Sequence, residues 1–465
     1  ITITVDFSTA VNVNTTGGTP TLALNGGGIA SYIGGSGTGT LTFSYVVGAG
    51  ENSADLDYSS STALALNGAS ITEAGGAQQN ASITLATPGT AGSLGASKDI
   101  VIDTTAPTNT VANASFSSDT GTSGSDFITK TAAQTISGTL ASNLAAGERV
   151  YVSLDNGSSW TLATASTGAN TWSLGGQTLT GSGTLKVRIS DDAGNHGSAF
   201  SQAYVLDTTA PTISFSDVTL SADTGASNTD LITNTAAQTI SATLSAAPAA
   251  GDIVQASLDN GASWTDVTSK VSGTTLTWNG VTLAASDTLQ FRVIDAAGNN
   301  GAVTSRAYVL DTTGPTSSVA SVAFSADSGA SNSDFITNTA DQTISGTLSA
   351  NLAAGETVLV SLDNGGSWVS ATATVGSNSW SLAGQTLTGS NTLLVKVSDL
   401  AGNDGAVMSQ AYVYDTEATV PTVDALTSNS TAPVLTGSAT LAAGETMTVT
   451  VGGATYNVTP VAGSW

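Results

Sequence analysis

The sequence predicts an all-β protein made of tandem antiparallel β-sandwiches, and three observations carry this prediction. The phrase DTTAPT begins at Asp103 and Asp207, returns as DTTGPT at Asp311 and appears in altered form as DTEATVPT at Asp415, each time 104 residues further on. Within one repeat, apolar and polar residues alternate with a period of two, as in ERVYVSLD and TLKVRIS. Asn-Gly, Gly-Ser and Ala-Gly turn signals interrupt this alternation at short intervals. Short strands in three complete copies indicate separate β-domains in series.

Seven strands are expected in the first complete copy. They are placed at residues 109–117, 133–140, 148–154, 160–165, 170–180, 184–190 and 200–206. Seven strands in roughly 100 residues are typical of a Greek-key, immunoglobulin-like sandwich. The linkers are only a few residues long and centre on Ala-Pro or Gly-Pro, which restricts the preceding residue to extended conformations. Tandem sandwiches joined in this way are expected to form an extended, monomeric rod.

At 465 residues the chain is too long for one hydrophobic core, and the repeat positions divide it into five parts. Residues 1–103 differ from the 104-residue pattern and are expected to form a distinct β-sandwich repeat module, truncated at its N-terminus. The remaining parts are expected to be three immunoglobulin-like repeats at 104–207, 208–311 and 312–417, and a truncated, divergent repeat at 418–465.

Composition excludes several classes of function. The chain has 34 acidic and 9 basic residues, so the net charge of −25 disfavours binding to nucleic acid and to anionic membrane surfaces. It has no cysteine and no apolar stretch long enough for a membrane helix, so neither disulfides nor membrane insertion are expected. The one histidine, His196, has Asn300 and Asp404 at the matching positions of the other repeats and therefore belongs to no repeated site. We expect no catalytic residues and no enzymatic activity.

Aspartates at repeating loop positions are the best candidates for a binding site. SDTGTSGSDFIT (118–129), between the first two expected strands, carries Asp119 and Asp126, and both later repeats preserve this arrangement. In an immunoglobulin-like sandwich this loop lies at the end where the last strand leaves the domain, close to the linker. The loop between the last two strands, with the pattern Asp-x-Ala-Gly-Asn, lies at the other end of each sandwich, so that of the following domain faces the same linker. Two aspartates of the first loop, one of the linker and one of the Asp-x-Ala-Gly-Asn loop are therefore expected to bring four carboxylates together at each junction.

Carboxylates gathered in this way repel one another unless a cation lies between them. Calcium prefers six to eight oxygen ligands, which carboxylates and a Gly-Ser-Asn-rich loop can supply, whereas softer metals prefer Cys and His. We therefore expect Ca²⁺ at the domain junctions. The alternative is that these aspartates are turn and cap residues that bind nearby backbone N–H groups without any metal. The candidate ligands are Asp103, Asp119, Asp126, Asp191, Asp207, Asp223, Asp230, Asp295, Asp311, Asp327, Asp334 and Asp399.

Three further repeated positions receive a structural interpretation. The LDNG phrases are read as hairpin turns in which Asn-Gly supplies positive φ angles. Trp160 and Trp172, with their counterparts, are expected in the core rather than as platforms for glycans. The basic residue that recurs on the sixth strand, as in Arg188, is expected to form an exposed ion pair. The three copies of this basic residue are Arg188, Arg292 and Lys396.

The combination of DTTAPT linkers, SDTG...SDFIT loops, VSLDNGxSW turns and DxAGN loops resembles the bacterial immunoglobulin-like repeats of giant RTX-type adhesins that are exported by type I secretion. The resemblance covers residues 104–417 strongly and 418–465 more weakly. It implies a secreted protein of the bacterial cell surface whose tandem repeats are an extender. Such an extender holds adhesive domains away from the cell for attachment and biofilm formation, and calcium stiffens its linkers. Departures at DTEATVPT and in the last repeat put calcium at the final junction in doubt.

Two other functions remain open from the sequence. One or more sandwiches could be a direct glycan- or protein-binding module of the same surface protein. The domains could also be accessory to a secreted polysaccharide-degrading enzyme whose catalytic domain lies elsewhere. For the extender, host or abiotic surfaces, glycans or proteins would be contacted through regions outside this segment.

Overall fold

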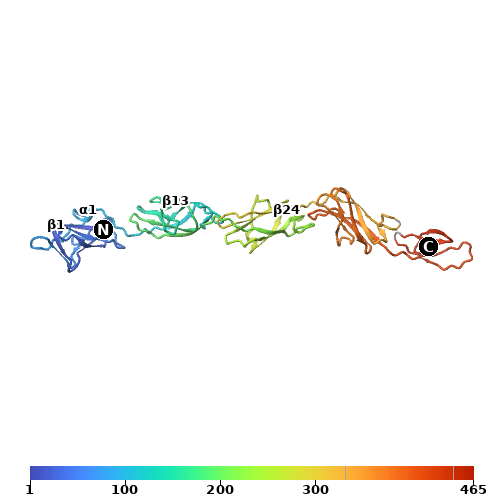
Figure 1. Cartoon of the computed structure of the whole chain (residues 1–465), viewed down its shortest axis with the longest axis horizontal. Helices are drawn as coiled ribbons and strands as arrows, with labels where there is room; N and C mark the ends of the chain where they lie inside the picture. Colours follow the sequence, from blue (N-terminus) through green and yellow to red (C-terminus); the bar gives the residue numbers. More distant parts are fainter. Residues whose placement is uncertain (330, 443–444) are drawn as a thin grey trace. The chain divides into compact units, whose positions relative to one another are not determined.

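The computed structural model describes residues 1–329, 331–442 and 445–465, and nearly all of its regular structure is β-strand (Figure 1). Its described helical segments are α1 (Leu94–Ser97) and a 3₁₀ turn at Thr268–Lys270. The chain divides into two compact units, Ile1–Ala210 with Asp295–Asn299, and Pro211–Ile294 with Asn300–Trp465. No helix in these described ranges is both long and apolar enough to cross a bilayer.

The N-terminal part of the first unit contains one six-stranded sheet, in the order β5-β2-β3-β4-β1-β6. Strand β1 pairs with β4 along its first half and with β6 along its second, with a register shift between Asp6 and Val11. The core of this part includes strand residues and residues of the following loops, with Leu41 and Phe43 completely buried. The strands are β1 (Thr2–Asn14), β2 (Thr21–Ala23), β3 (Ile29–Gly34), β4 (Thr38–Ser44), β5 (Leu64–Ala65) and β6 (Ser70–Glu73).

The first repeat is a two-layer sandwich. One sheet has the order β11-β10-β14-β15-β8 and the other has the order β12-β13-β9-β7. Alternate side chains from both sheets meet between the layers, so that Ile136, Val150 and Val187 have no exposed surface. The strands are β7 (Val111–Phe116), β8 (Ile128–Thr129), β9 (Ala133–Leu140), β10 (Arg149–Ser153), β11 (Thr161–Leu162), β12 (Thr164–Ala165), β13 (Thr171–Thr178), β14 (Gly183–Ser190) and β15 (Phe200–Leu206).

The second unit contains two more sandwiches with the same strand order. In the second repeat the sheets are β16-β18-β22-β21 and β17-β24-β23-β19-β20, and in the third they are β25-β27-β31-β30 and β26-β33-β32-β28-β29. Tandem immunoglobulin-like sandwiches are therefore the architecture of all three repeats, as the sequence predicted. The second repeat has β16 (Phe215–Leu220), β17 (Ile232–Thr233), β18 (Ala237–Leu244), β19 (Ile253–Ser257), β20 (Thr265–Asp266), β21 (Val271–Ser272), β22 (Thr275–Thr282), β23 (Asp287–Ile294) and β24 (Thr304–Leu310).

The third repeat and the C-terminal segment complete the second unit. The C-terminal segment forms two separate two-stranded sheets, β34-β35 and β36-β37. The strands are β25 (Val319–Phe324), β26 (Ile336–Thr337), β27 (Asp341–Leu348), β28 (Thr357–Ser361), β29 (Val369–Ser370), β30 (Thr372–Ala373), β31 (Ser379–Thr386), β32 (Asn391–Ser398), β33 (Met408–Tyr414), β34 (Thr422–Val423), β35 (Gly437–Ser438), β36 (Met447–Val451) and β37 (Ala454–Val458).

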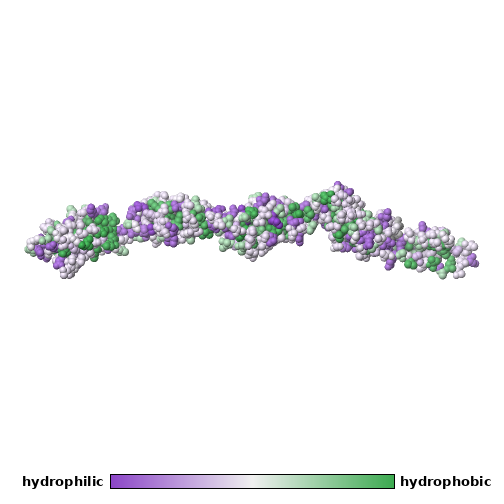
Figure 2. Space-filling view, viewed as in Figure 1, coloured by the Kyte–Doolittle hydropathy of each residue, from purple (hydrophilic) through white to green (hydrophobic). Residues whose placement is uncertain are grey.

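Two features of the sandwiches go beyond the seven expected strands. The expected strand at 160–165 divides into β11 and β12, which pair with different sheets. In addition, a two-residue strand inside the loop after β7 pairs in parallel with the last strand of the repeat, through Ile128 and Val205. Two residues are too few to show an alternating pattern, so this pairing could not be predicted. Figure 2 shows hydrophilic and hydrophobic residues interspersed on the visible surface.

Candidate functional site

The β7–β9 loop lies where the sequence analysis placed it, at the end of the sandwich where the chain leaves. Its short strand β8 pairs with the end of β15, and the Asp207 N–H donates a hydrogen bond to the Thr129 carbonyl at 3.0 Å. The second and third repeats make the same bonds, from Asp311 to Thr233 and from Asp415 to Thr337. The loop that carries the aspartate pair is therefore attached directly to the start of the linker in each repeat.

The two aspartates of this loop hold its backbone in an uncommon conformation. The Phe127 N–H donates to Asp119 Oδ2 at 2.9 Å, and the Ile128 N–H donates to Asp126 Oδ1 at 3.0 Å. Phe127 has a φ of 63° and is buried, although bulky residues rarely adopt positive φ. The same paired bonds recur around Leu231 and Phe335, whose φ angles are 63° and 61°. Strained backbone of this kind persists only where the surroundings stabilise it.

One carboxylate oxygen in each copy of the loop is buried without a hydrogen-bond partner among the residues that the structure describes. These atoms are Oδ1 of Asp119, Asp223 and Asp327. Burial raises the pKa of Asp119, and the nearby charge of Asp126 raises it further. Burial likewise raises the pKa of Asp223, and Asp230 adds to the effect. The loop therefore holds two carboxylates that accept backbone N–H bonds but have no ion-pair partner among the described residues, which is an electrostatic setting that favours a hard cation.

The linker aspartates form short turns. An oxygen of Asp103 accepts from the Thr105 N–H, one of Asp207 from Thr209 and one of Asp311 from Thr313, each at 2.9 Å. These are the local bonds expected of aspartate in a turn.

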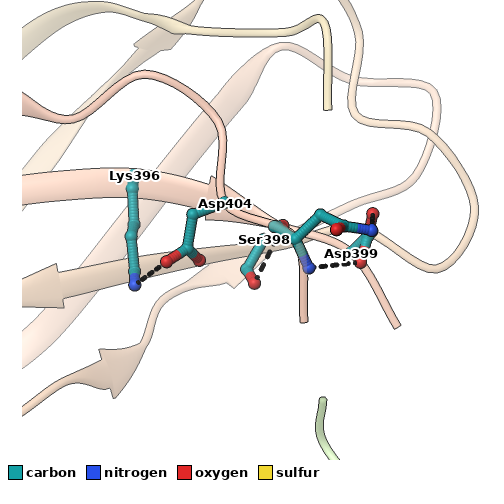
Figure 3. Close-up of polar contacts among 5 residues, drawn as sticks. Lys396, Ser398, Asp399 and Asp404 are labelled. Atoms are coloured by element: carbon teal, nitrogen blue, oxygen red, sulfur yellow. Dashed lines mark hydrogen bonds and ion pairs between the residues drawn. The ribbon is translucent and has the colours of Figure 1, made fainter. Parts of the chain in front are cut away.

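The aspartates of the Asp-x-Ala-Gly-Asn loops are each bonded to the asparagine of the same loop. Asn403 donates from its backbone N–H to Asp399 Oδ1 at 2.9 Å and from its side chain to Asp399 Oδ2, also at 2.9 Å (Figure 3). Asp191 and Asp295 have the same two bonds from Asn195 and Asn299. Burial opposes ionisation of Asp191, but the bonds from Asn195 prevail and lower its pKa.

No three His, Cys, Asp or Glu side chains gather as a possible metal-binding group in the ranges that the structure describes. The four carboxylates expected at each junction are thus not brought together. Within the loops the aspartates are close enough for the charge of Asp126 to act on Asp119 and that of Asp230 on Asp223. A cation at either pair would take its other ligands from neutral oxygens. These pairs remain candidate ligands, and the acids of the linkers and of the Asp-x-Ala-Gly-Asn loops have the turn contacts that the alternative interpretation described.

Sequence reasoning missed two polar residues that position these loops. The side-chain amides of Asn195, Asn299 and Asn403 also donate to the carbonyls of the linker residues Asp103, Asp207 and Asp311. The second residue is a glutamine in the phrase that reads AAQTIS or ADQTIS, and it is buried in every repeat. Its recurrence every 104 residues was a visible signal, since an amide at a core position of a strand needs partners. The glutamines are Gln134, Gln238 and Gln342.

The LDNG phrases form the hairpin turns expected of them. Asn156 and Gly157 both have positive φ, and Asp155 accepts hydrogen bonds from the hydroxyls of Ser153 and Ser159. Hydrogen bonds from the Ser263 and Ser257 hydroxyls lower the pKa of Asp259 to about 2.

The prediction that the tryptophans lie in the core is right for Trp172 and wrong for Trp160. Trp172 and Trp380 are buried in their cores, but Trp160 is only half-buried, and the guanidinium of Arg188 lies 4.0 Å from its ring centroid. The indole N–H donates to the Gly157 carbonyl, so the turn and the arginine together enclose the ring. Trp264 under Arg292 and Trp368 under Lys396 repeat this stacking.

The ion pair expected of the basic residue on the sixth strand forms in one of the three repeats. Lys396 contacts Asp404 at 2.6 Å (Figure 3), whereas no ion pair of Arg188 or Arg292 is present among the described residues. Asp404 has His196 and Asn300 as its counterparts, neither of which carries a negative charge. The cation–π contact is therefore the shared role of the three basic residues.

Comparison with known domain families identifies three segments of the chain. Residues 103–208 and 314–416 match a model described as a bacterial Ig-like domain, and residues 232–312 match a second model with the same description. The comparison with curated proteins found no match.

Several solved structures resemble the chain. A tetra-tandem repeat in the extending region of a large adhesion protein is 18% identical over 90% of this chain and 95% of that chain, with a TM-score of 0.24. A Ca²⁺-stabilized adhesin that helps an Antarctic bacterium bind ice is 24% identical over 78% of this chain and 90% of that chain, with a TM-score of 0.30. An I-band fragment of titin is 11% identical over 65% of this chain and 97% of that chain, with a TM-score of 0.28. Scores this low support no functional conclusion.

Proposed function

This chain carries bacterial Ig-like domains in tandem, and from that premise we propose that it is a structural extender segment of a bacterial cell-surface adhesin. The segment holds adhesive domains away from the cell for attachment and biofilm formation, and calcium stiffens the junctions between its repeats. The chain is secreted by the RTX-type, type I route and works outside the cell. We assign it no catalytic role.

The observation that carries this proposal is the same loop at the same place in three successive repeats. In each copy two aspartates hold a residue at positive φ, one carboxylate oxygen is buried with no partner in the described part of the chain, and the loop is bonded to the first residue of the linker. A ligand site for an external partner needs to occur only once, whereas a device that stiffens every junction must recur at every junction. This distribution supports a mechanical role for the loop.

The residues fit calcium because their free oxygens are hard ligands with uncompensated charge. Asp119 and Asp126 would hold the ion in the first repeat, Asp223 and Asp230 in the second, and Asp327 and Asp334 in the third. When bound, the ion supplies positive charge that removes the repulsion between the two carboxylates. The loop is bonded to the linker through β8, so a more stable loop also restricts the residues that follow β15.

Deletion of one whole repeat tests the extender role in the intact surface protein. Removal of residues 208–311 joins Asp207 to Thr312 and recreates the linker phrase DTTGPT. We expect the shortened protein to be displayed normally and adhesion to decline gradually, because only the distance from the cell changes. Insertion of a second copy of residues 104–207 at the same joint should restore adhesion. Abolished adhesion at unchanged display, not rescued by that insertion, would identify residues 208–311 as a specific binding module instead.

A further inference from the structure

We propose that consecutive repeats also bind each other directly, through a Thr-Gly step in the β7–β9 type of loop and an Ala-Gly step in the Asp-x-Ala-Gly-Asn loop of the following repeat, without any metal. The Thr-Gly steps are called docking steps and the Ala-Gly steps receiving steps. The docking steps are Thr120–Gly121, Thr224–Gly225 and, with serine, Ser328–Gly329. The receiving steps are Ala193–Gly194, Ala297–Gly298 and Ala401–Gly402.

A threonine hydroxyl makes the polar part of this contact. In the first compact unit Thr120 Oγ1 donates to the Ala297 carbonyl at 2.7 Å, and in the second unit Thr224 Oγ1 donates to the Ala401 carbonyl at 2.5 Å. Each hydroxyl accepts a bond in return from a backbone N–H of its own loop, that of Lys130 or Asn234. This bond holds the hydroxyl oxygen in place within its own loop. The contact needs no carboxylate.

The glycine of each docking step allows the two loops to come into close contact. Gly121 has a φ of 102°, and a Cβ added there would lie 1.9 Å from the Ala296 carbonyl oxygen. Gly225 has a φ of 94°, and a Cβ there would lie 1.9 Å from the Leu400 carbonyl oxygen. Real Cβ atoms do not come so close to an oxygen, so only glycine permits this approach. The backbones of the two loops therefore lie in direct contact at both junctions.

The repeats that lack a partner loop provide an internal comparison. Ala297 and Ala401 are each 1% exposed, whereas the equivalent Ala193 is exposed, and no described atom lies within 4 Å of a Cβ added to Gly194. At the other end of the series, a Cβ on Gly329 would meet only the Ile336 carbonyl of its own loop, at 4.0 Å, among the described atoms. The docking loop thus keeps its shape without a partner, since φ is 104° at Gly329. The receiving alanine is buried only where a docking step covers it.

This contact predicts a component of junction stiffness that resists both chelators and salt. At the second junction the hydroxyl–carbonyl bond and the packing of glycine on a carbonyl involve no ionised group, so screening has little effect on them, whereas at the first junction the Lys130 ammonium also donates to the Gly298 carbonyl. The aspartate pair lies beside the docking step in the same loop. Calcium would then add to a junction that the neutral contact has already formed, and the two contributions can be measured separately.

Distance measurements between spin labels across the second junction test the proposal. The chain has no cysteine, so Ser272→Cys and Ser379→Cys in the full chain give one label in each of the two repeats, both at exposed positions. With excess chelator, we expect a narrow distance distribution. Gly225→Ala should broaden it about twofold, because a contact of 1.9 Å must be relieved by separation of the loops.

The matched control is Gly329→Ala, which adds the same Cβ at nearly the same φ but meets no neighbouring loop among the described residues. It should leave the distribution unchanged. Thr224→Val is a second variant that retains Gly225 and should also broaden the distribution, while Ser328→Ala should not. A distribution that is already broad in chelator, or one that Gly225→Ala and Thr224→Val leave unaltered, would overturn the proposal. Because calcium is absent throughout, these outcomes are independent of the calcium-dependent part of the proposed function.

Discussion

In calcium, the Asp223→Asn chain is expected to unfold in its second repeat at a lower temperature than the unsubstituted chain, whereas in chelator it unfolds at the same temperature or higher. The substitution removes one carboxylate of the pair with Asp230 and leaves an amide oxygen that can still accept from the Leu231 N–H. A ligand present at a hundred times its Kd stabilises a folded domain by about 2.7 kcal/mol. For a domain of about 100 residues this corresponds to roughly 10–20 °C.

The expected behaviour in chelator follows from the direction of the pKa shift. Burial and the charge of Asp230 raise the pKa of Asp223 in the folded state. The folded protein therefore binds the proton more tightly than the unfolded chain does, and this stabilising contribution is lost as pH rises through the raised pKa. Without a cation at neutral pH, the ionised pair destabilises its own loop. Asparagine removes that cost, and its amide can donate to Asp230.

Hydrogen exchange followed by mass spectrometry resolves the second repeat from its neighbours and is the appropriate measurement. The control is Asp287→Asn, which removes an exposed negative charge from the same repeat at the start of β23. The control should keep the full protective effect of calcium. If Asp223→Asn and the unsubstituted chain gained equal protection from calcium, the carboxylate pair would be a turn feature and the ion would bind elsewhere or not at all.

Replacement of Gln134 by alanine is expected to destabilise the first repeat by about 2–3 kcal/mol, since each buried polar group left without its partner costs about 1–3 kcal/mol. Its amide donates to the Ser118 carbonyl at 2.9 Å and to the Thr131 carbonyl at 2.7 Å, and its oxygen accepts from the Ser118 N–H at 3.0 Å. Gln134 therefore ties the two ends of the loop that carries Asp119. We expect both the thermal stability of the repeat and the calcium response of that loop to fall.

Gln177→Ala is the matched control in the same repeat. The amide of Gln177 donates to the Gly175 carbonyl on the surface, and its loss should change stability by less than about 0.5 kcal/mol. The measurement is urea unfolding, monitored through hydrogen exchange of the first repeat. Equal destabilisation by the two substitutions would show that the buried amide of Gln134 contributes no more to stability than the surface amide of Gln177.

The strands and turns of the repeats could be predicted from the sequence, because each repeat forms the same sandwich from strands in which apolar and polar residues alternate. The expected strand at 133–140 matches β9 (Ala133–Leu140), and the strand at 200–206 matches β15 (Phe200–Leu206). The end of the sandwich that carries the β7–β9 loop was predicted correctly because it follows from the order of strands in this fold. The positive φ angles at Asn156 and Gly157 follow from the residue types themselves.

The contacts between side chains at the junction could not be predicted in the same way. Loop position indicates which end of a domain a residue occupies, but not whether its carboxylate points to a neighbour or back to its own backbone. Asp295 illustrates this difference, because both of its oxygens bind Asn299 of the same loop. Trp160 was misassigned because a strand-like position does not distinguish the core from a surface on which a basic side chain covers the ring.

Small-angle scattering of the full chain, in millimolar calcium and then in excess chelator, tests the central claim most directly. The longest strands of the repeats have eight residues, which is about 26 Å of extended chain, and the loops at both ends add to the length of each sandwich. In calcium we expect a large maximum dimension and the scattering profile of a stiff chain. In chelator we expect the profile of a flexible chain, and renewed addition of calcium should restore the profile measured first. Asp119→Asn, Asp223→Asn and Asp327→Asn combined should make the profile insensitive to calcium. Identical profiles of the unsubstituted chain in calcium and in chelator would contradict the claim that calcium stiffens these junctions.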